Sequence, residues 1–257
     1  MMEEETTALR HRIPAALRAL ALGGLHSIFP PRCICCGNAV GTDFGLCGDC
    51  WRETGFITGL VCETCGTPLP GEADQATLCD ECLTHPRPWD RGRAALRYNG
   101  SGRRMVLALK HGDRLDLARP LGGWMARAAT PLIEPGLIVA PIPLHRLRLL
   151  KRQYNQSALL SRIVAQTHGV QHIPDLFQRI RATPSQEGRS REERQENLTD
   201  ALRVNPRRAA ALRGQAVLIV DDVMTSGATF AAATAAAHAA GAAKVHIVAL
   251  ARVAKDA

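Results

Sequence analysis

Aromatic residues are scarce in this chain of 257 residues, where phenylalanine, tryptophan and tyrosine together make up 4%. A hydrophobic core must therefore be built mainly from alanine, leucine, valine and isoleucine. The overall shares of hydrophobic residues, 46%, and of charged residues, 22%, are ordinary for a soluble globular protein. The length allows one sizeable core with a small module, or two compact domains.

The chain also lacks an unbroken apolar run long enough to cross a membrane. Its best candidate, residues 13–29, is interrupted by Arg18 and His26, which excludes a helix that spans a bilayer. Residues 1–7 are acidic and do not resemble a secretory signal, so we expect a cytoplasmic protein with no membrane insertion. The leucine spacing in residues 8–28 predicts an amphipathic helix that packs against the protein's own core.

Cysteine is absent after residue 82, and all nine cysteines fall between Cys33 and Cys82. Eight of them form CxxC pairs, namely Cys33/Cys36, Cys47/Cys50, Cys62/Cys65 and Cys79/Cys82. In a protein that is not exported, such spacing favours metal binding over disulfides. A CxxC turn places two thiolates on one side of a tight backbone knuckle, which is half of a tetrahedral zinc site.

The gaps between the pairs, ten and thirteen residues, suit two successive zinc ribbons, each closed by four sulfurs. We expect consecutive pairs to share a zinc ion, although a cross-braced arrangement has compatible spacing. Because such sites have no open coordination position, both Zn²⁺ ions should be structural rather than catalytic. Gly37 and Gly66 follow two of the knuckles, where a turn often needs a residue without a Cβ, and Cys35 is a spare thiol.

From residue 91 onward the pattern changes to alternating strands and helices. Short apolar runs predict strands at residues 93–98, 137–140, 176–180, 217–220 and 245–251. Helical spacing predicts helices at residues 103–111, 116–129, 157–166 and 228–240, with a turn at 99–100. Residues 182–197 are too polar to be buried and predict a loop. This alternation is typical of an α/β fold, a mostly parallel sheet with helices on both faces.

The most informative stretch, VLIVDDVMTSGAT, runs from residue 217 to residue 229. An apolar strand leads into two carboxylates, Asp221 and Asp222, and then into a turn of small residues and a helix. Open α/β sheets bind ligands at the carboxyl ends of their strands. The turn offers consecutive backbone N–H groups and three hydroxyls to a phosphate, and the start of the helix adds a favourable field. The two carboxylates can accept hydrogen bonds from the vicinal hydroxyls of a sugar.

This stretch resembles the phosphoribosyl pyrophosphate (PRPP) signature of type I phosphoribosyltransferases. The resemblance implies that Asp221 and Asp222 hold the ribose hydroxyls. It also implies that the turn cradles the 5′-phosphate through Thr225, Ser226, Gly227, Ala228 and Thr229. Mg²⁺ is expected to accompany PRPP, carried largely by the oxygens of the ligand itself.

The net charge of +8 is concentrated in residues 145–213, which contain 14 lysines and arginines against 6 aspartates and glutamates. Such a segment suits phosphate-rich ligands, although a solvated basic face has the same composition. By resemblance, one loop of the segment receives the pyrophosphate, with Pro143, Leu144, His145, Arg148, Lys151 and Arg152. A second, flexible loop closes over PRPP, with Arg181, Gln186, Arg189 and Arg194. Cationic donors there would stabilise a departing pyrophosphate, and closure would exclude water.

Several segments together resemble the ComF competence protein family, namely the double ribbon, LKHGDR (109–114), PIPLH (141–145), YNQ (154–156), RATPSQ (181–186) and VDDVMTSGAT (220–229). The resemblance covers residues 30 to about 253. It predicts an N-terminal helix (1–29), a double zinc ribbon (30–88) and a type I phosphoribosyltransferase domain (92–257). One departure is Gln153, where many relatives have glycine. The resemblance implies a role in natural transformation, in the handling of incoming single-stranded DNA with DNA-uptake proteins.

Three functions remain open from the sequence. The first is a PRPP-binding accessory protein of DNA uptake, with or without phosphoribosyl transfer. The second is an enzyme of nucleotide metabolism, either a salvage transferase or an amidophosphoribosyltransferase. The glutamine-dependent form of the latter is disfavoured, because it requires an N-terminal cysteine nucleophile and the chain begins Met1-Met2-Glu3. The third is a zinc-ribbon nucleic-acid binder without chemistry, which the intact acid pair disfavours. No catalytic residue stands out, His111 and His145 are candidate bases by position only, and the oligomeric state is not predicted.

Overall fold

The computed structural model describes residues 29–112, 114–144, 153–180 and 201–253, so the predicted N-terminal helix lies outside the described residues. The chain divides into two compact units, residues 1–49 and residues 50–257. In the first unit, Arg32 and Ala39 form an antiparallel bridge around the first cysteine knuckle. Two short helices belong to the cysteine-rich region, α2 (Gly48–Glu53) and α3 (Asp80–Thr84).

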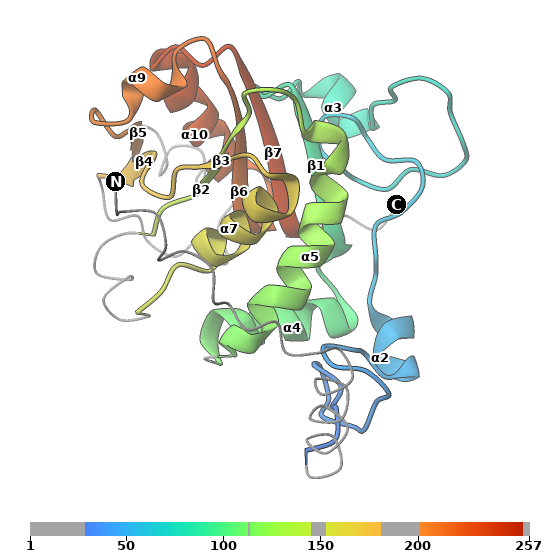
Figure 1. The fold of residues 1–257 in the computed structure, drawn as a ribbon. Coiled ribbons are helices and arrows are strands. Elements are labelled where there is room, and N and C mark those ends of the chain that lie inside the picture. The colour runs from blue at the N-terminus through green and yellow to red at the C-terminus, as the bar shows by residue number, and fades with distance from the viewer. Residues whose placement is uncertain (1–28, 113, 145–152, 181–200, 254–257) are drawn as a thin grey trace, which may run out of the picture. The chain divides into compact units, whose positions relative to one another are not determined.

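A parallel sheet forms the centre of the second unit (Figure 1). Within the described residues it has five strands in the order β1-β7-β6-β2-β3, and every neighbouring pair is parallel. The strands are β1 (Arg91–Arg97), β2 (Ile138–Pro141), β3 (Gln171–His172), β6 (Ala216–Met224) and β7 (Lys244–Arg252). The two central strands β6 and β7 are apolar and buried on both sides, as expected where other elements cover both faces. The predicted α/β fold is confirmed.

Helices α5 and α7 cover one face of the sheet, where they pack against each other and against β1, β2, β6 and β7 (Figure 1). The elements that lead into and out of these helices are short. Their bounds are α4 (Gly100–His111), η1 (Leu115–Leu117), α5 (Ala118–Ala129), η2 (Thr130–Leu132) and α7 (Gln156–His168). None of the described helices is long and apolar enough to cross a membrane.

The other face of the sheet is covered by α10 (Ala228–Ala239) and by the second cysteine-rich ribbon. Phe230 of α10 is fully buried and meets the ring of Trp89 edge to face at 6.2 Å between centroids. Cys62, Cys65 and Cys82 belong to the same hydrophobic core. A small antiparallel hairpin and one helical turn complete this side, namely β4 (Phe177–Arg179), β5 (Leu202–Val204) and α9 (Ala209–Leu212).

The backbone of the second ribbon lies directly on β1, and two glycines permit this approach. A Cβ on Gly92 would collide with the carbonyl oxygen of Thr64, and a Cβ on Gly66 would lie 2.8 Å from the backbone nitrogen of Ala94. The second ribbon thus shares the core of the sheet.

The main differences from the predicted elements are at their ends. The strand predicted at residues 217–220 continues to Met224, because Asp221 and Val223 pair with Ala249 and Ala251 of β7. Helix α4 begins at Gly100, where a turn was predicted. The strands β3 and β5 were not predicted, since segments of two or three residues carry no measurable periodicity.

Candidate functional site

The two predicted acids lie side by side near the carboxyl end of β6, and each has a partner from another element. The hydroxyl of Ser157, at the start of α7, donates to Asp221 Oδ1 at 2.8 Å. The same oxygen accepts the backbone N–H of Asp222 at 2.9 Å. Lys110 Nζ of α4 forms an ion pair with Asp222 Oδ2 at 3.3 Å. The acids are thus held in place by Ser157, which was not predicted as a site residue, and by Lys110, which lies in the LKHGDR segment but had no predicted role.

The electrostatics of this pair favour a proton on one carboxyl near neutral pH. Burial and the neighbouring charge of Asp222 raise the pKa of Asp221 to about 7, against the hydrogen bond from Ser157 and the charge of Lys110. Asp222 is 8% exposed. A ligand that brings hydroxyl donors or a cation to this place would favour the fully ionised pair.

The YNQ segment connects the start of α7 to the end of α4. The hydroxyl of Tyr154 donates to the carbonyl oxygen of Leu109 at 2.8 Å. The amide of Gln156 donates to the carbonyl oxygen of Lys110 at 3.2 Å. These two bonds fix the backbone of Lys110, and so the origin of the side chain that reaches Asp222.

Asn155, the central residue of the YNQ segment, aligns Ser157 with the acid pair. Its side chain caps α7 by accepting the backbone N–H of Ser157 at 3.1 Å, and its amide donates to the carbonyl oxygen of Ile142 at 2.9 Å. Gln153, which precedes the YNQ segment, has a φ of 62°, in the left-handed region. Glycine adopts this conformation without strain, which explains why a glycine suits this position.

The turn after β6 leads directly into the N-terminus of α10. Gly227 precedes the first residue of α10 and has a φ of 84°. The Ser226 hydroxyl accepts the backbone N–H of Ala228 at 3.4 Å, and Thr225 is exposed. The first N–H groups of a helix have no partner within the helix, so this turn can present donors to an anion.

The structure describes only part of the two predicted basic loops. Pro143 and Leu144 follow β2 and are partly exposed, and the carbonyl oxygen of Pro143 accepts from Arg179 Nε at 3.2 Å. Their predicted companions lie outside the described residues, namely His145, Arg148, Lys151 and Arg152. The same holds for the flexible-loop set, Arg181, Gln186, Arg189 and Arg194.

The cysteines form two tetrads, each with all sulfur atoms within 4.8 Å of one another. The tetrads are Cys33, Cys36, Cys47 and Cys50, and Cys62, Cys65, Cys79 and Cys82. The sulfurs of Cys36 and Cys47, and those of Cys65 and Cys79, are 3.6 Å apart. Four sulfurs about 2.3 Å from a central Zn²⁺ require a similar spacing. Consecutive CxxC pairs therefore share a site, and the chain has two Cys₄ sites that fit structural zinc.

Both predicted glycines take the left-handed conformation that closes a knuckle. Gly37 has a φ of 81° and donates its N–H to the carbonyl oxygen of Cys33 at 2.9 Å. Gly66 has a φ of 68° and donates to the carbonyl oxygen of Cys62 at 2.9 Å. Cys35 belongs to neither tetrad, as predicted from its position outside the pairs.

The surroundings of the second tetrad also fit a bound zinc ion. Four thiolates and one Zn²⁺ carry a charge of −4 + 2 = −2. Two buried guanidinium groups lie beside them, with the side chains of Arg87 and Arg252 exposed by 6% and 4%. A hydrogen bond from Cys62 and the charge of Arg252 lower the pKa of Cys65, whereas the same hydrogen bond and burial raise the pKa of Cys62 to about 12. Buried cations require such anionic partners.

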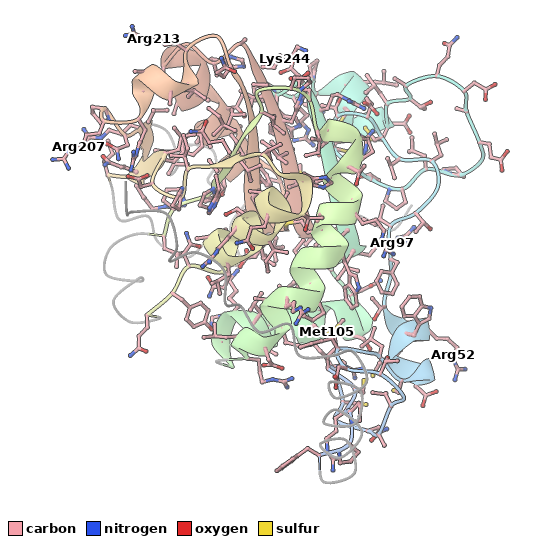
Figure 2. The ribbon with its side chains drawn as sticks, in the orientation of Figure 1. Arg52, Arg97, Met105, Arg207, Arg213 and Lys244 are labelled. Atoms are coloured by element: carbon pink, nitrogen blue, oxygen red, sulfur yellow. The ribbon has the colours of Figure 1, made fainter. Side chains whose placement is uncertain are left out.

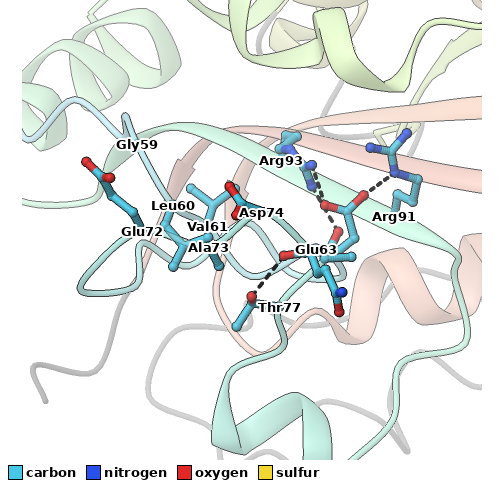
Figure 3. Close-up of a pocket in the computed structure, with 12 residues that line it drawn as sticks. Gly59, Leu60, Val61, Glu63, Glu72, Ala73, Asp74, Thr77, Arg91 and Arg93 are labelled. Carbon is cyan, nitrogen blue, oxygen red and sulfur yellow. Dashed lines mark hydrogen bonds and ion pairs between the residues drawn. The ribbon is translucent and has the colours of Figure 1, made fainter.

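A hollow beside the second ribbon contains none of the predicted PRPP residues (Figure 3). Its charged lining includes Glu63, Arg91 and Arg93, and the ion pairs of Glu63 with both arginines are drawn in Figure 3. Burial alone would raise the pKa of Glu63, but the hydrogen bonds from Arg93 and Arg91 outweigh burial and lower it. These charges are already paired with one another, so they hold the ribbon to β1.

Comparisons with known proteins identify both parts of the chain. The family described as Double zinc ribbon domain matches residues 24–83, and the family described as Phosphoribosyl transferase domain matches residues 161–257. Glutamine PRPP amidotransferase from B. subtilis, a solved structure with ADP and GMP, is similar with a TM-score of 0.38 and 16% identity, over 56% of this chain and 30% of that one.

Curated relatives cover most of the chain. DNA utilization protein YhgH of Salmonella typhimurium is 33% identical over 194 residues, which are 73% of this chain and 82% of the relative. Competence protein F of Haemophilus influenzae is 28% identical over 212 residues, which are 79% of this chain and 89% of the relative. With its two Cys₄ ribbons and its type I phosphoribosyltransferase domain, the chain belongs to the ComF family.

Proposed function

We propose that the chain binds PRPP at the carboxyl end of β6. In this proposal Asp221 and Asp222 accept hydrogen bonds from the ribose hydroxyls, and the turn from Thr225 to Thr229 binds the 5′-phosphate. The observation that carries the proposal is the acid pair itself. It is held by Ser157 and Lys110 and is followed directly by the Gly227 turn at the start of α10.

Mg²⁺ is part of the proposal as a cation that accompanies PRPP and neutralises its pyrophosphate. The chain's own contribution is to orient the ribose. Lys110 and Ser157 hold the two carboxylates in place for the ribose hydroxyls. If transfer occurs, an acceptor forms a bond to C1 while the bond from C1 to the pyrophosphate oxygen breaks, and pyrophosphate leaves with the electron pair.

We further propose that PRPP binding serves the handling of incoming single-stranded DNA in the cytoplasm. The names of the relatives, DNA utilization protein and Competence protein F, support this role. So does a group of exposed arginines on β5 and on the segments that flank α9, namely Arg203, Arg207, Arg208 and Arg213. Figure 2 shows Arg207 and Arg213 pointing outward from this region. Exposed guanidinium groups suit contacts with phosphates along a nucleic-acid strand.

Calorimetric titration of the zinc-loaded full chain with PRPP and Mg²⁺ tests the ligand. Wild type should bind, and the double variant Asp221→Asn plus Asp222→Asn should lose most of the affinity. The matched control, Glu72→Gln plus Asp74→Asn, removes the same two negative charges from an exposed loop of the second ribbon and should bind normally. Equal affinity of the Asp221/Asp222 variant and the control would refute the assignment.

Two further measurements separate the proposed role from nucleotide metabolism. Release of pyrophosphate from PRPP in the presence of a nucleobase or ammonia would favour a metabolic transferase. Binding to single-stranded DNA that weakens steeply with salt would favour DNA handling, because phosphate contacts release counterions. If neither pyrophosphate release nor DNA binding is observed, both roles are contradicted. PRPP binding itself is then still judged by the titration.

A further inference from the structure

One guanidinium group connects the second ribbon with the predicted phosphate-binding turn. Arg87, on the segment between the ribbon and β1, donates from Nη1 to the carbonyl oxygen of Ser226 at 2.9 Å. Its Nη2 pairs with Glu81 Oε1 at 2.8 Å. Glu81 lies on α3, next to the predicted zinc ligand Cys82. One terminal nitrogen of the Arg87 guanidinium therefore contacts the ribbon, and the other contacts the turn.

The bond to Ser226 fixes the orientation of one peptide group in the turn. A trans peptide is planar, so the C=O of Ser226 and the N–H of Gly227 point in opposite directions. Because Arg87 holds the C=O toward the ribbon, the N–H of Gly227 is directed away from the ribbon. That N–H is one of the donors that a helix N-terminus offers to a phosphate.

The side chain of Trp89 packs next to the same peptide group. Its indole Nε1 donates to the carbonyl oxygen of Thr64 at 2.6 Å, inside the knuckle between Cys62 and Cys65. Its ring occupies the space next to Gly227, where a Cβ would lie 2.8 Å from the ring atom Cη2. The knuckle of the second tetrad is thereby linked to the turn through one side chain.

Arg87 cannot leave this position without a cost. Its side chain is 6% exposed, and its guanidinium lies 5.8 Å from the centre of the Trp89 ring. Among the described residues its Nε is buried without a hydrogen-bond partner. Its ion pair with Glu81 ties the guanidinium to α3, the helix that contains Cys82 of the second tetrad.

We propose that Arg87 is a positioning residue through which the second zinc ribbon sets the affinity of the turn for the 5′-phosphate. It acts by orienting the peptide between Ser226 and Gly227. The ligand part of this inference rests on the proposed PRPP function, whereas the effect on the turn does not.

The ligand test uses the zinc-loaded full chain with Arg87→Gln, Arg87→Lys and the control Arg93→Gln. Arg93 is also a largely buried arginine at the contact of the ribbon with β1, but it bonds to Glu63 and to the backbone of Gly92. We expect Arg87→Gln to bind ribose 5-phosphate about tenfold more weakly, as after loss of one charged hydrogen bond. Lysine is a point charge that cannot span both partners, so Arg87→Lys should be intermediate.

Pyrophosphate with Mg²⁺ is the second probe, because it lacks the 5′-phosphate. Its affinity should be unchanged in Arg87→Gln, the zinc content should stay at that of wild type, and Arg93→Gln should bind both probes normally. Equal weakening of both probes, or an equal effect of Arg93→Gln, would indicate general loss of structure and overturn the proposal.

Hydrogen exchange measured by mass spectrometry on the ligand-free protein provides a readout that needs no PRPP. Backbone amides of residues 225–230 should exchange faster in Arg87→Gln and at an intermediate rate in Arg87→Lys. If Arg87→Gln does not fold, Arg87→Lys carries both readouts. A wild-type chain that does not bind PRPP would refute the proposed function. The exchange rates would still show whether Arg87 holds the turn in place. Wild-type exchange in a folded Arg87 variant would show that the arginine does not hold the turn.

Discussion

The hydroxyl of Ser157 and the carboxylate of Asp221 are 64 positions apart in the chain and form a hydrogen bond of 2.8 Å. This bond joins the first turn of α7 to the carboxyl end of β6. It works against the burial that raises the pKa of Asp221. The ionised form of the acid, which a ribose diol requires as acceptor, therefore depends on Ser157.

Replacement of Ser157 by alanine should weaken PRPP binding at pH 7 by about tenfold, because an acceptor of the diol loses a hydrogen bond and becomes harder to ionise. Calorimetric titration with PRPP and Mg²⁺ at pH 6, 7 and 8 measures the effect, and the deficit should shrink at pH 8. Ser161→Ala is the control, since Ser161 is also buried on α7 but bonds to Ala158 and His172. An equal loss in both variants would contradict the role of Ser157.

Asp221 should also make stability depend on pH. Its pKa in the folded chain is about 7, above the usual 3.8, so the folded state binds this proton more tightly than the unfolded state. The stabilisation is complete below about pH 4 and is lost as the pH rises through 7. Urea unfolding of wild type and Asp221→Asn at pH 5, 6, 7 and 8 isolates this contribution. As the pH rises, the free energy of unfolding of wild type should fall relative to that of the variant. Parallel pH profiles of the two proteins would show that Asp221 has an ordinary pKa.

Replacement of Gln153 by glycine should stabilise the chain by about 0.5–1 kcal/mol, because a left-handed φ is strained for glutamine and unstrained for glycine. Gln166→Gly provides the comparison, since this exposed residue lies inside α7, where glycine should destabilise by about 1 kcal/mol. Urea unfolding at one pH measures both. The idea fails if the two variants change stability in the same direction.

Loss of the two zinc sites should have different effects on the sheet. Cys79→Ser disrupts a tetrad whose other three members lie in the sheet core, so it should lower the thermal unfolding temperature of the second unit. Cys36→Ser disrupts the other tetrad, which has Cys33, Cys36 and Cys47 in the first unit and only Cys50 in the second, and should shift that transition much less. Differential scanning calorimetry, together with zinc content measured by atomic emission, tests the contrast. Equal shifts in both variants would contradict it.

Patterns within short stretches predicted much of this structure. The apolar runs of β6 and β7 predicted buried parallel strands, because a sheet covered on both faces needs apolar residues on both faces. The CxxC spacing predicted the two tetrads, and the position of Gly37 and Gly66 predicted their left-handed knuckles. In each case the residues that determine the structural feature lie within a few positions of it in the sequence.

Relationships between distant residues could not be predicted in this way. The roles of Ser157 and Lys110 arise from contacts with β6, 64 and 112 positions away. Nothing local distinguishes the serine that follows YNQ from an ordinary first-turn residue. The contact of the second ribbon with β1 depends on Gly66 and Gly92, which resemble any turn glycine until the sheet is assembled.

The close approach at Gly66 and Gly92 has a consequence for engineering. A chimaera joined in the proline-containing segment before β1 would separate these two surfaces, and a new ribbon with a side chain at the position of Gly66 would collide with the strand. A junction near residue 50 keeps both surfaces in one piece but separates Cys50 from the other cysteines of the first tetrad. For transplantation, the sheet should therefore be moved together with the second ribbon, which shares its core.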